Sequence, residues 1–352
     1  MLFQFELLDY FHTPMNIAFY IRMLRKMSVR KWLNAVQLYV SFHLSRLFKT
    51  NMHSGLPMAL SIEPTTSCNL RCPECPSGLR SFTRDTGMLD EDMFRKVIDE
   101  TSSHLSYLTF YFQGEPFLNT NFLRMVAYAH QRRIITATST NAHYLHPKNA
   151  EEVVKSGLDK LIISLDGITQ ETYVKYRVGG QIDKVIEGTK NMIAAKKKLN
   201  SQTPYLVFQF LVVQHNEHEI EAARKLTQEL GVDELVLKTA QIYDYENGSE
   251  FIPKNEKYSR YKRTATGKYV IKNKLENSCW RMWSSAVLTW DGNMVPCCFD
   301  KDATHTLGNV FSNSLQTVWS NNSYQQFRNS ILKSRAEIDI CKNCSEGSKV
   351  FA

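Results

Sequence analysis

The sequence lacks an uninterrupted apolar run of about 18 residues, so we expect no transmembrane helix. Its first residues include Glu6 and Asp9 and lack a basic start followed by an apolar core, so we expect no secretory signal. It also lacks a basic tract interleaved with aromatic residues, which argues against a nucleic-acid partner despite a net charge of +8. These absences favour a globular protein in the cytoplasm.

Cysteine, by contrast, is present eight times. In a chain for which no export signal is expected, cysteines are more typical of metal ligands than of disulfides. Three of them fall within residues 68–75, and five fall between residues 279 and 344. Both groups require a reducing compartment, which again indicates the cytoplasm.

The 352 residues, 43% of them hydrophobic, suffice for one large α/β domain and a smaller one. Their pattern predicts three regions. Residues 1–54 form an amphipathic helical extension, residues 55–245 form the core, and residues 246–352 form a small domain that contains the other five cysteines.

The core alternates short apolar segments that are typical of strands with longer segments that are typical of helices. Six strand–helix units imply a parallel sheet whose ligand site lies at the carboxyl ends of the strands. Because six units are too few for a closed eight-stranded barrel, we expect an α/β fold, a partial (β/α)6 TIM-like barrel. The expected strands are 58–63, 107–112, 135–140, 160–165, 205–213 and 234–239. The expected helices are 90–102, 121–132, 149–156, 183–198 and 217–230.

The first cysteine group, Cys68, Cys72 and Cys75, directly follows the first expected strand. The spacing Cys-x3-Cys-x2-Cys supplies three thiolates from one short loop. Three thiolates hold three irons of a [4Fe–4S] cluster and leave one iron open for a small ligand. The alternative is a structural zinc site, which would need a fourth ligand from elsewhere in the chain.

This loop resembles that of the radical S-adenosylmethionine (SAM) superfamily, and the resemblance covers roughly residues 58–245. It implies that the open iron binds SAM and that an electron from the cluster cleaves SAM to a 5′-deoxyadenosyl radical. It further implies a reducing partner such as flavodoxin or ferredoxin. The segment Gln113-Gly114-Glu115-Pro116 ends the second expected strand and looks like the family's Gly-Gly-Glu-Pro motif, with Gln113 in place of the first glycine. The resemblance makes these four residues candidates for binding SAM.

Polar side chains also end the third and fourth expected strands. The family places contacts to the SAM ribose and carboxylate at these positions. Ser139, Asn141, Ser164 and Asp166 are therefore further candidates for binding SAM. The alternative for each residue is an ordinary cap at a strand end.

The second cysteine group consists of Cys279, Cys297, Cys341 and Cys344. Asp291-Gly292 predicts a hairpin turn between the first two, which would bring those cysteines together. Four thiolates suit either a second [4Fe–4S] cluster or a structural zinc ion. Cys298 is left over, and we expect it to be a buried thiol because neighbouring residues of a strand point in opposite directions.

The spacing Cys-x12-Gly-x4-Cys resembles the opening of the C-terminal SPASM and twitch domains of the same family. The full SPASM pattern has seven cysteines and two auxiliary clusters, and nothing corresponding to its final cysteines follows Cys344. The resemblance therefore implies the shorter twitch form, a small α+β domain with one auxiliary [4Fe–4S] cluster.

Residues 16–48 have a helical pattern with a polar stripe among apolar and aromatic residues. The stripe consists of Arg30, Asn34, Gln37, Ser41 and Ser45. The helix either packs over an open edge or the bottom of the barrel or lies in a membrane interface. In the second case the protein would be peripheral at the inner membrane face.

The leading hypothesis for function is a radical SAM oxidoreductase that dehydrogenates a sugar-like or lipid-linked small molecule, with the auxiliary cluster as electron acceptor. The second is a maturase that modifies a ribosomally made peptide. The third is an iron–sulfur electron carrier, which the open iron argues against because a simple carrier prefers fully ligated irons. Arg177 and Lys238 are candidates for catalytic or substrate-binding residues, and Gln209 and Tyr243 are further candidates.

Overall fold

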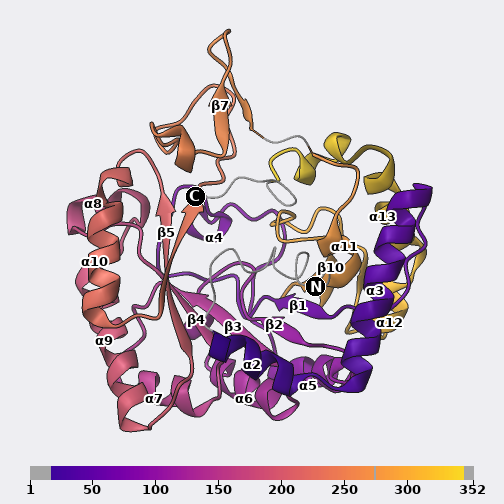
Figure 1. The fold of residues 1–352 in the computed structure, drawn as a ribbon, viewed down its shortest axis with the longest axis horizontal. Helices are drawn as coiled ribbons and strands as arrows, with labels where there is room; N and C mark the ends of the chain where they lie inside the picture. Colours follow the sequence, from indigo (N-terminus) through magenta and orange to yellow (C-terminus); the bar gives the residue numbers. More distant parts are fainter. Residues whose placement is uncertain (1–16, 273–274, 345–352) are drawn as a thin grey trace. The chain divides into compact units, whose positions relative to one another are not determined.

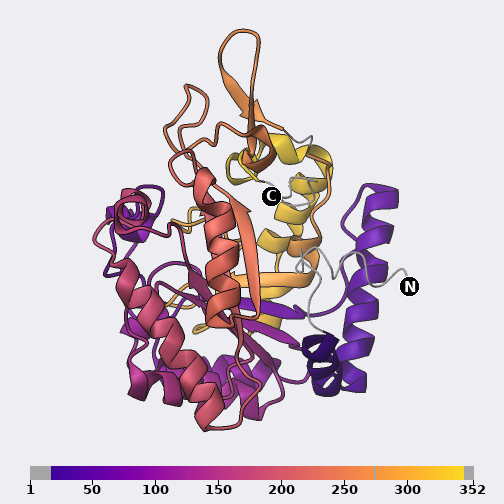
Figure 2. The same ribbon diagram turned by 60° about the vertical axis from the view of Figure 1, so that its left-hand side comes forward.

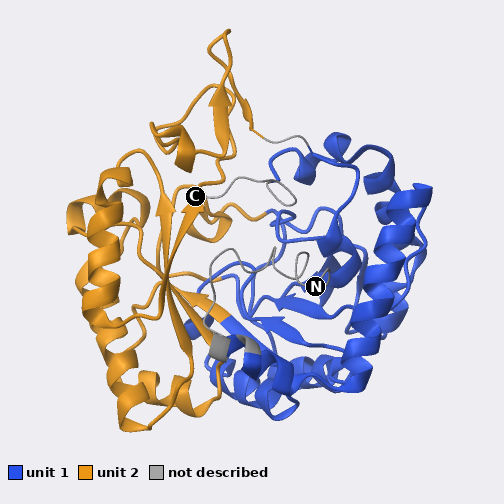
Figure 3. Ribbon diagram, viewed as in Figure 1, with its two compact units in different colours: residues 1–66, 83–137, 275–347 blue, residues 67–82, 138–274, 348–352 orange. Residues whose placement is uncertain are grey.

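The computed structural model describes residues 17–272 and 275–344, and the chain divides into two compact units (Figure 3). Unit 1 comprises residues 1–66, 83–137 and 275–347. Unit 2 comprises residues 67–82, 138–274 and 348–352. Each unit combines segments that are distant in the sequence, so the units do not test the predicted domain boundaries near residues 54 and 245. Those boundaries remain predictions.

The strands of unit 1 lie in the order β11-β10-β9-β1-β2-β3 (Figure 1). Strands β1, β2 and β3 are parallel, as predicted. Strand β9 pairs parallel with the other edge of β1, and β10 and β11 continue antiparallel. The bounds are β1 Ala59–Ile62, β2 Tyr107–Thr109, β3 Ile135–Thr140, β9 Ser285–Leu288, β10 Asn293–Val295 and β11 Gly308–Asn309. The last three residues of β3 belong to unit 2.

The helices of unit 1 begin where the sequence supplies capping side chains. Asp90 is the N-cap of α5 and accepts hydrogen bonds from the amides of Asp92 and Met93. The turn at Gly292, whose φ is 82°, joins β9 to β10, so the predicted hairpin is confirmed. The helices are α2 Ile17–Lys26, α3 Val29–Phe48, α5 Glu91–Thr101, η2 Pro116–Leu118, α6 Phe122–Gln131, α11 Trp280–Ser284, α12 Leu315–Trp319, α13 Asn322–Ser334, η5 Arg335–Glu337 and η6 Asp339–Cys341.

Unit 2 contains three parallel strands in the order β4-β5-β6 and an antiparallel pair, β7 and β8. Helices α9 and α10 lie along the outer side of the parallel strands (Figures 1 and 2). The strands are β4 Lys160–Ser164, β5 Tyr205–Val212, β6 Glu234–Thr239, β7 Tyr261–Arg263 and β8 Tyr269–Ile271. The helices are α4 Pro76–Leu79, α7 Pro147–Lys155, α8 Gln170–Tyr176, α9 Ile182–Lys198, η3 Glu217–Glu219, α10 Ile220–Leu230 and η4 Glu256–Tyr258.

The predicted α/β fold with a parallel sheet and a small C-terminal domain is confirmed, and all six predicted strands are present. Several features differ from the predictions, among them helix α13 and the strand pair β7–β8, which were not predicted. Helix α8 was not predicted. The predicted helical segment 16–48 is two helices, because Ser28 has extended backbone and caps α3 by accepting a hydrogen bond from the Lys31 amide. No helix in the described part of the chain is long and apolar enough to cross a bilayer.

Candidate active site and auxiliary cysteine site

The first three cysteines lie on the loop that leads into α4, and all of them belong to unit 2. Cys75 is the N-cap of α4, and its amide donates to the Cys72 carbonyl oxygen at 3.3 Å. The Leu70 amide donates to Cys68 Sγ at 3.4 Å. Gly78 allows α4 to pack against the loop, because a Cβ atom there would lie 2.5 Å from the Cys72 nitrogen. These local contacts fix the conformation of the loop at Cys68, Cys72 and Cys75.

The Arg177 guanidinium joins this loop to the end of β4. Its Nη1 donates to Cys72 Sγ at 3.7 Å, and its Nε donates to Asp166 Oδ2 at 2.5 Å. The Asp166 side chain is fully buried, and its other oxygen accepts from the Leu211 amide at 2.8 Å. Burial raises the pKa of the Cys72 thiol, and the Arg177 charge opposes that rise. A Cys72 thiolate therefore requires nearby positive charge, which Arg177 supplies in part and which bound iron would complete.

Polar residues at the ends of β3 and β4 belong to the same unit as the cysteine loop. Asn141 Nδ2 donates to the Oδ1 of Asn69, which lies within the cysteine motif, at 2.7 Å. Asn141 Oδ1 accepts from the His143 amide at 3.1 Å. Ser139 is half-buried, and Ser164 is buried. Of the four strand-end residues predicted to bind SAM, Asn141 and Asp166 thus contact the cysteine loop or its arginine, while Ser139 and Ser164 keep only their predicted role.

The predicted Gly-Glu-Pro motif belongs to unit 1 and follows β2. Gly114 has a φ of 75°, a backbone conformation that favours glycine. Glu115 is 2% exposed, and its Oε1 accepts from the Phe117 amide at 3.4 Å, which caps the short helix η2 at Pro116. Gln113 is buried. The predicted contacts of these residues to SAM remain predictions.

The weaker candidates are scattered over unit 2. Lys238 is exposed on β6, and Gln209 is half-buried on β5 in register with Ser164. The Tyr243 amide donates to Glu74 Oε2 at 3.0 Å, and the Tyr243 side chain is exposed. Catalytic roles for these residues remain predictions.

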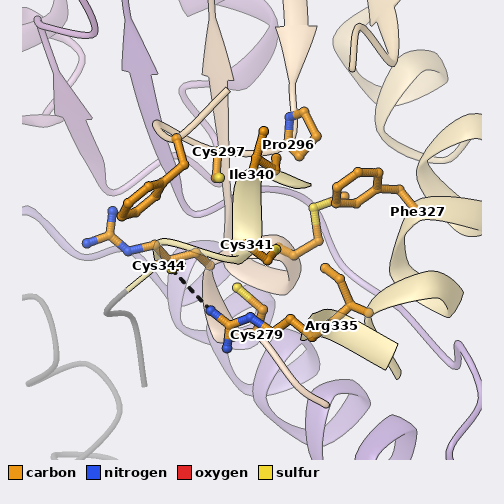
Figure 4. Close-up of a pocket in the computed structure, with 12 residues that line it drawn as sticks. Cys279, Pro296, Cys297, Phe327, Arg335, Ile340, Cys341 and Cys344 are labelled. Carbon is orange, nitrogen blue, oxygen red and sulfur yellow. Dashed lines mark hydrogen bonds between the residues drawn. The ribbon is translucent and has the colours of Figure 1, made fainter. Parts of the chain in front are cut away.

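The other four predicted ligand cysteines line one pocket of unit 1 (Figure 4). Cys341 and Cys344 are buried, and Cys279 and Cys297 are half-buried. No three His, Cys, Asp or Glu side chains in the described part of the chain are placed to bind one metal ion. Four thiols around a common cavity supply the donor set of either a [4Fe–4S] cluster or a structural zinc ion.

Arg335 lines this pocket together with the cysteines. The Arg335 side chain donates from Nη2 to Cys344 Sγ at 3.3 Å and from Nη1 to the Ser278 carbonyl oxygen at 2.7 Å. Burial raises the pKa values of the Cys297 and Cys341 thiols. Buried thiols that resist ionisation in the free protein become thiolates when a metal supplies the opposing charge, so this donor set suits iron.

Cys298 does not line the pocket. It is half-buried rather than buried, and it packs against the apolar cluster formed by Phe112, Val287 and Val295. Its sulfur accepts from Arg281 Nη1 at 3.9 Å. Strand β10 ends at Val295, so Cys297 and Cys298 lie beyond it, and the strand alternation on which the prediction for Cys298 rested does not apply.

Sequence reasoning missed the contacts of Arg335 and Asn69 and paired neither Arg177 nor Asp166 with the cysteine loop. Asn69 lies inside the Cys-x3-Cys motif, so its position was a usable signal. Arg335 precedes Cys341 by six residues without any periodic pattern, so its contact with a cysteine depends on the turn that η5 and η6 make.

Two family descriptions match the chain. Residues 62–227 match the radical SAM superfamily, and residues 279–345 match SPASM, an iron–sulfur cluster-binding domain. The matched segments contain the two groups of cysteines described above. They imply a SAM-binding [4Fe–4S] cluster, an auxiliary [4Fe–4S] cluster and SAM itself as cofactors.

Characterised proteins with similar sequences cover most of the chain. The cofactor-modifying protein of the tungsten-containing aldehyde ferredoxin oxidoreductase from Pyrococcus furiosus is 25% identical over 81% of this chain and 86% of its own length. The SAM-dependent 2-deoxy-scyllo-inosamine dehydrogenase from Niallia circulans is 23% identical over 82% of this chain and 93% of its own length.

A solved structure shares the fold. The crystal structure of Streptococcus suis SuiB bound to the precursor peptide SuiA is 15% identical, covers 87% of this chain and 74% of SuiB, and has a TM-score of 0.60. From the two matched segments and the cysteine sites that they contain, the chain belongs to the radical SAM superfamily and is an enzyme with a C-terminal SPASM-type auxiliary iron–sulfur domain.

Proposed function

We propose that this enzyme is an oxidoreductase that dehydrogenates a small sugar-like or lipid-linked metabolite. The observation that carries the proposal is the pocket in which four cysteines face one cavity. Four thiolates leave no iron open for a substrate, so a cluster held there is suited to electron transfer. The dehydrogenase from Niallia circulans, which is similar over nearly its whole length, supports an oxidative reaction.

We assign the SAM-binding cluster to Cys68, Cys72 and Cys75 and the auxiliary cluster to the four cysteines of the unit 1 pocket. The SAM-binding cluster would supply the electron that cleaves SAM to a hydrogen-abstracting radical. The auxiliary cluster would accept the electron that the substrate loses. We also assign contacts to SAM to the residues predicted from the strand ends. These residues are Gln113, Gly114, Glu115, Pro116, Ser139, Asn141, Ser164 and Asp166.

The role of the two arginines follows from their charge and burial. Arg177, held by the Asp166 carboxylate, places a cation beside Cys72, and Arg335 places one beside Cys344. A buried cation favours the more negative of two oxidation states at a nearby group. Arg335 therefore favours electron acceptance at the auxiliary site, which an oxidation requires. The electron that starts the reaction needs a reductant, and we propose flavodoxin or ferredoxin.

The second candidate function is a peptide maturase. SuiB, which shares the fold, binds a precursor peptide. The dehydrogenase is 23% identical to this chain and SuiB is 15% identical, so the sequence similarity favours the small-molecule enzyme. We therefore rank the peptide substrate second.

The reaction is tested with a substrate that carries deuterium at the reacting carbon. If the enzyme is a dehydrogenase, SAM is consumed, deuterium appears in 5′-deoxyadenosine, and the product is lighter by two hydrogen atoms. Mass spectrometry of both products measures this outcome. The Cys298→Ala variant serves as the control, because Cys298 lies outside both predicted ligand sets.

Return of deuterium to the product with regeneration of SAM would exclude the oxidation and leave the radical SAM assignment intact. A cross-linked peptide product would favour the maturase.

A further inference from the structure

The side of α3 that packs against the rest of unit 1 contains several polar residues. Lys31, Asn34, Ser41 and Ser45 are buried there. Lys31 Nζ donates to the Arg133 carbonyl oxygen at 2.8 Å, and burial lowers the Lys31 pKa to about 8. These polar side chains make specific hydrogen bonds, so the helix is fixed in this orientation. Most of the polar stripe seen in the sequence therefore points inward.

Asn34 and Ser41 illustrate how the inward face is satisfied. Asn34 Nδ2 donates to the Leu56 carbonyl oxygen, and its Oδ1 accepts from the Leu56 amide, both at 2.8 Å. The Ser41 hydroxyl donates to the Leu38 carbonyl oxygen at 2.9 Å. Apolar contacts of Ala35, Leu38 and Phe42 with Met58 and Trp280 complete the packing.

The opposite side of α3 presents large apolar side chains to solvent. Leu33 is 64% exposed and Leu47 is 71% exposed. We name the exposed apolar residues of this side, which recur every three to four positions, the α3 stripe: Val29, Trp32, Leu33, Val36, Val40, Leu44 and Leu47. The stripe extends along a 20-residue helix at the outer edge of unit 1 (Figures 1 and 2), a length of about 30 Å. A continuous exposed apolar stripe of this length indicates a binding surface.

The charged residues of the sequence segment that contains the stripe are all positive. The sequence contains no Asp or Glu between Asp9 and Glu63, and seven Lys and Arg residues fall in that interval. Arg30 and Lys49 are exposed at the two ends of α3. Arg46 Nη2 forms a salt bridge with Glu276 Oε2 at 3.1 Å. The surface is therefore apolar along its middle and basic at its ends.

We propose that the α3 stripe lies in the interface of an anionic lipid bilayer, with its apolar residues among the acyl chains and Arg30 and Lys49 at the headgroups. An apolar helix side with flanking cations and an aromatic residue matches the chemistry of interfacial helices. A nucleic acid backbone is charged and would not bury the apolar side chains of the stripe. A second copy of the chain would bring equal positive charges together, so charge complementarity favours the lipid surface. The proposal is independent of the substrate proposed above.

The experiment uses the full-length protein with its clusters reconstituted under anaerobic conditions. Flotation is measured with vesicles of phosphatidylcholine alone and with vesicles in which part of the phosphatidylcholine is replaced by the anionic lipid phosphatidylglycerol. Both are used at low and at high salt. The test variant combines Leu33→Glu and Leu47→Glu. The control combines Leu199→Glu and Val270→Glu, which changes the charge equally at two exposed apolar residues of unit 2.

We expect the protein to float with phosphatidylglycerol vesicles at low salt and to dissociate at high salt. The test variant should bind more weakly by a factor of about ten or more, because two leucines that would lie among the acyl chains are replaced by anions. The control should bind as the wild type does, and both variants should keep the wild-type melting temperature and SAM cleavage.

Three outcomes would overturn the proposal. The first is absence of flotation with anionic vesicles, and the second is undiminished binding by the test variant. The third is a dimer in analytical ultracentrifugation that the test variant dissociates, since a second copy would then cover the stripe.

Discussion

At the scale of single residues, the structure gives Arg177 two contacts that the sequence did not indicate. The sequence suggested a substrate anchor, and the structure places its guanidinium between Asp166 and Cys72. Asp166 was predicted to bind SAM, which stays a prediction, and the structure shows that its two oxygens accept from Arg177 and the Leu211 amide. Asp166 and Arg177 are eleven positions apart, and no sequence spacing predicts their ion pair. The pair depends on α8, which lies between them and positions Arg177 at its C-terminal end.

Replacing Arg177 by glutamine should lower the midpoint potential of the SAM-binding cluster. The substitution removes a cation beside Cys72, so the reduced and more negative state of the cluster loses stabilisation. We expect a decrease of roughly 60 mV, which corresponds to a factor of ten for a one-electron couple. A redox titration followed by electron paramagnetic resonance measures it.

The matched control for this variant is Lys175→Gln. Lys175 lies on α8 and pairs with Glu171 at 3.4 Å on an exposed surface. Its loss should leave the potential unchanged. Equal potentials in wild type and Arg177→Gln would show that the arginine has only a structural role.

At the scale of elements, α4 depends on one glycine. A Cβ atom at position 78 would lie 2.5 Å from the Cys72 nitrogen and 2.6 Å from its carbonyl oxygen. Gly78→Ala should therefore displace the cysteine loop and destabilise the protein by about 1–3 kcal/mol, as overpacking does. We expect the variant to lose the SAM-binding cluster and to keep the auxiliary one.

Thermal unfolding and iron analysis of the reconstituted protein measure this prediction. Ser81→Ala, at an exposed position shortly after α4, is the control and should behave as the wild type. Full iron content in Gly78→Ala would mean that the loop can shift without losing its ligands.

The elements differ in how well the sequence predicted them. The six strands of the core were predictable because each is a short apolar segment with a local pattern. The addition of β9 to the edge of β1 was not, since pairing between distant segments leaves no local signal. The orientation of α3 was also not predictable, because hydrogen bonds from Asn34 and Ser41 to the following loop decide it.

At the scale of the whole molecule, the two groups of cysteines predict two clusters per chain. Anaerobic reconstitution should yield about eight irons for two [4Fe–4S] clusters. Cys68→Ala and Cys279→Ala should each reduce this by about four irons, and the first should also abolish SAM cleavage. Iron and sulfide analysis measures the content.

Cys298→Ala is the matched control and should keep the full iron content, because Cys298 lies outside the pocket that the four cysteines line. Zinc in place of about four of the irons would contradict the auxiliary cluster. The first cysteine group was recognisable because its spacing is local, and the second because Cys-x12-Gly-x4-Cys resembles a known domain, whereas the arginines beside them depend on tertiary contacts.

The position of β1 between β2 and β9 has a consequence for synthesis of the chain on the ribosome. Strand β9 begins more than 200 residues after β1, so unit 1 remains incomplete until the C-terminal segment emerges. At about 5–20 residues per second, this delay lasts on the order of tens of seconds. During that time α3 lacks Trp280, against which it packs in the finished fold. The N-terminal helices of a nascent chain would therefore be exposed to chaperones on both their inner and outer faces.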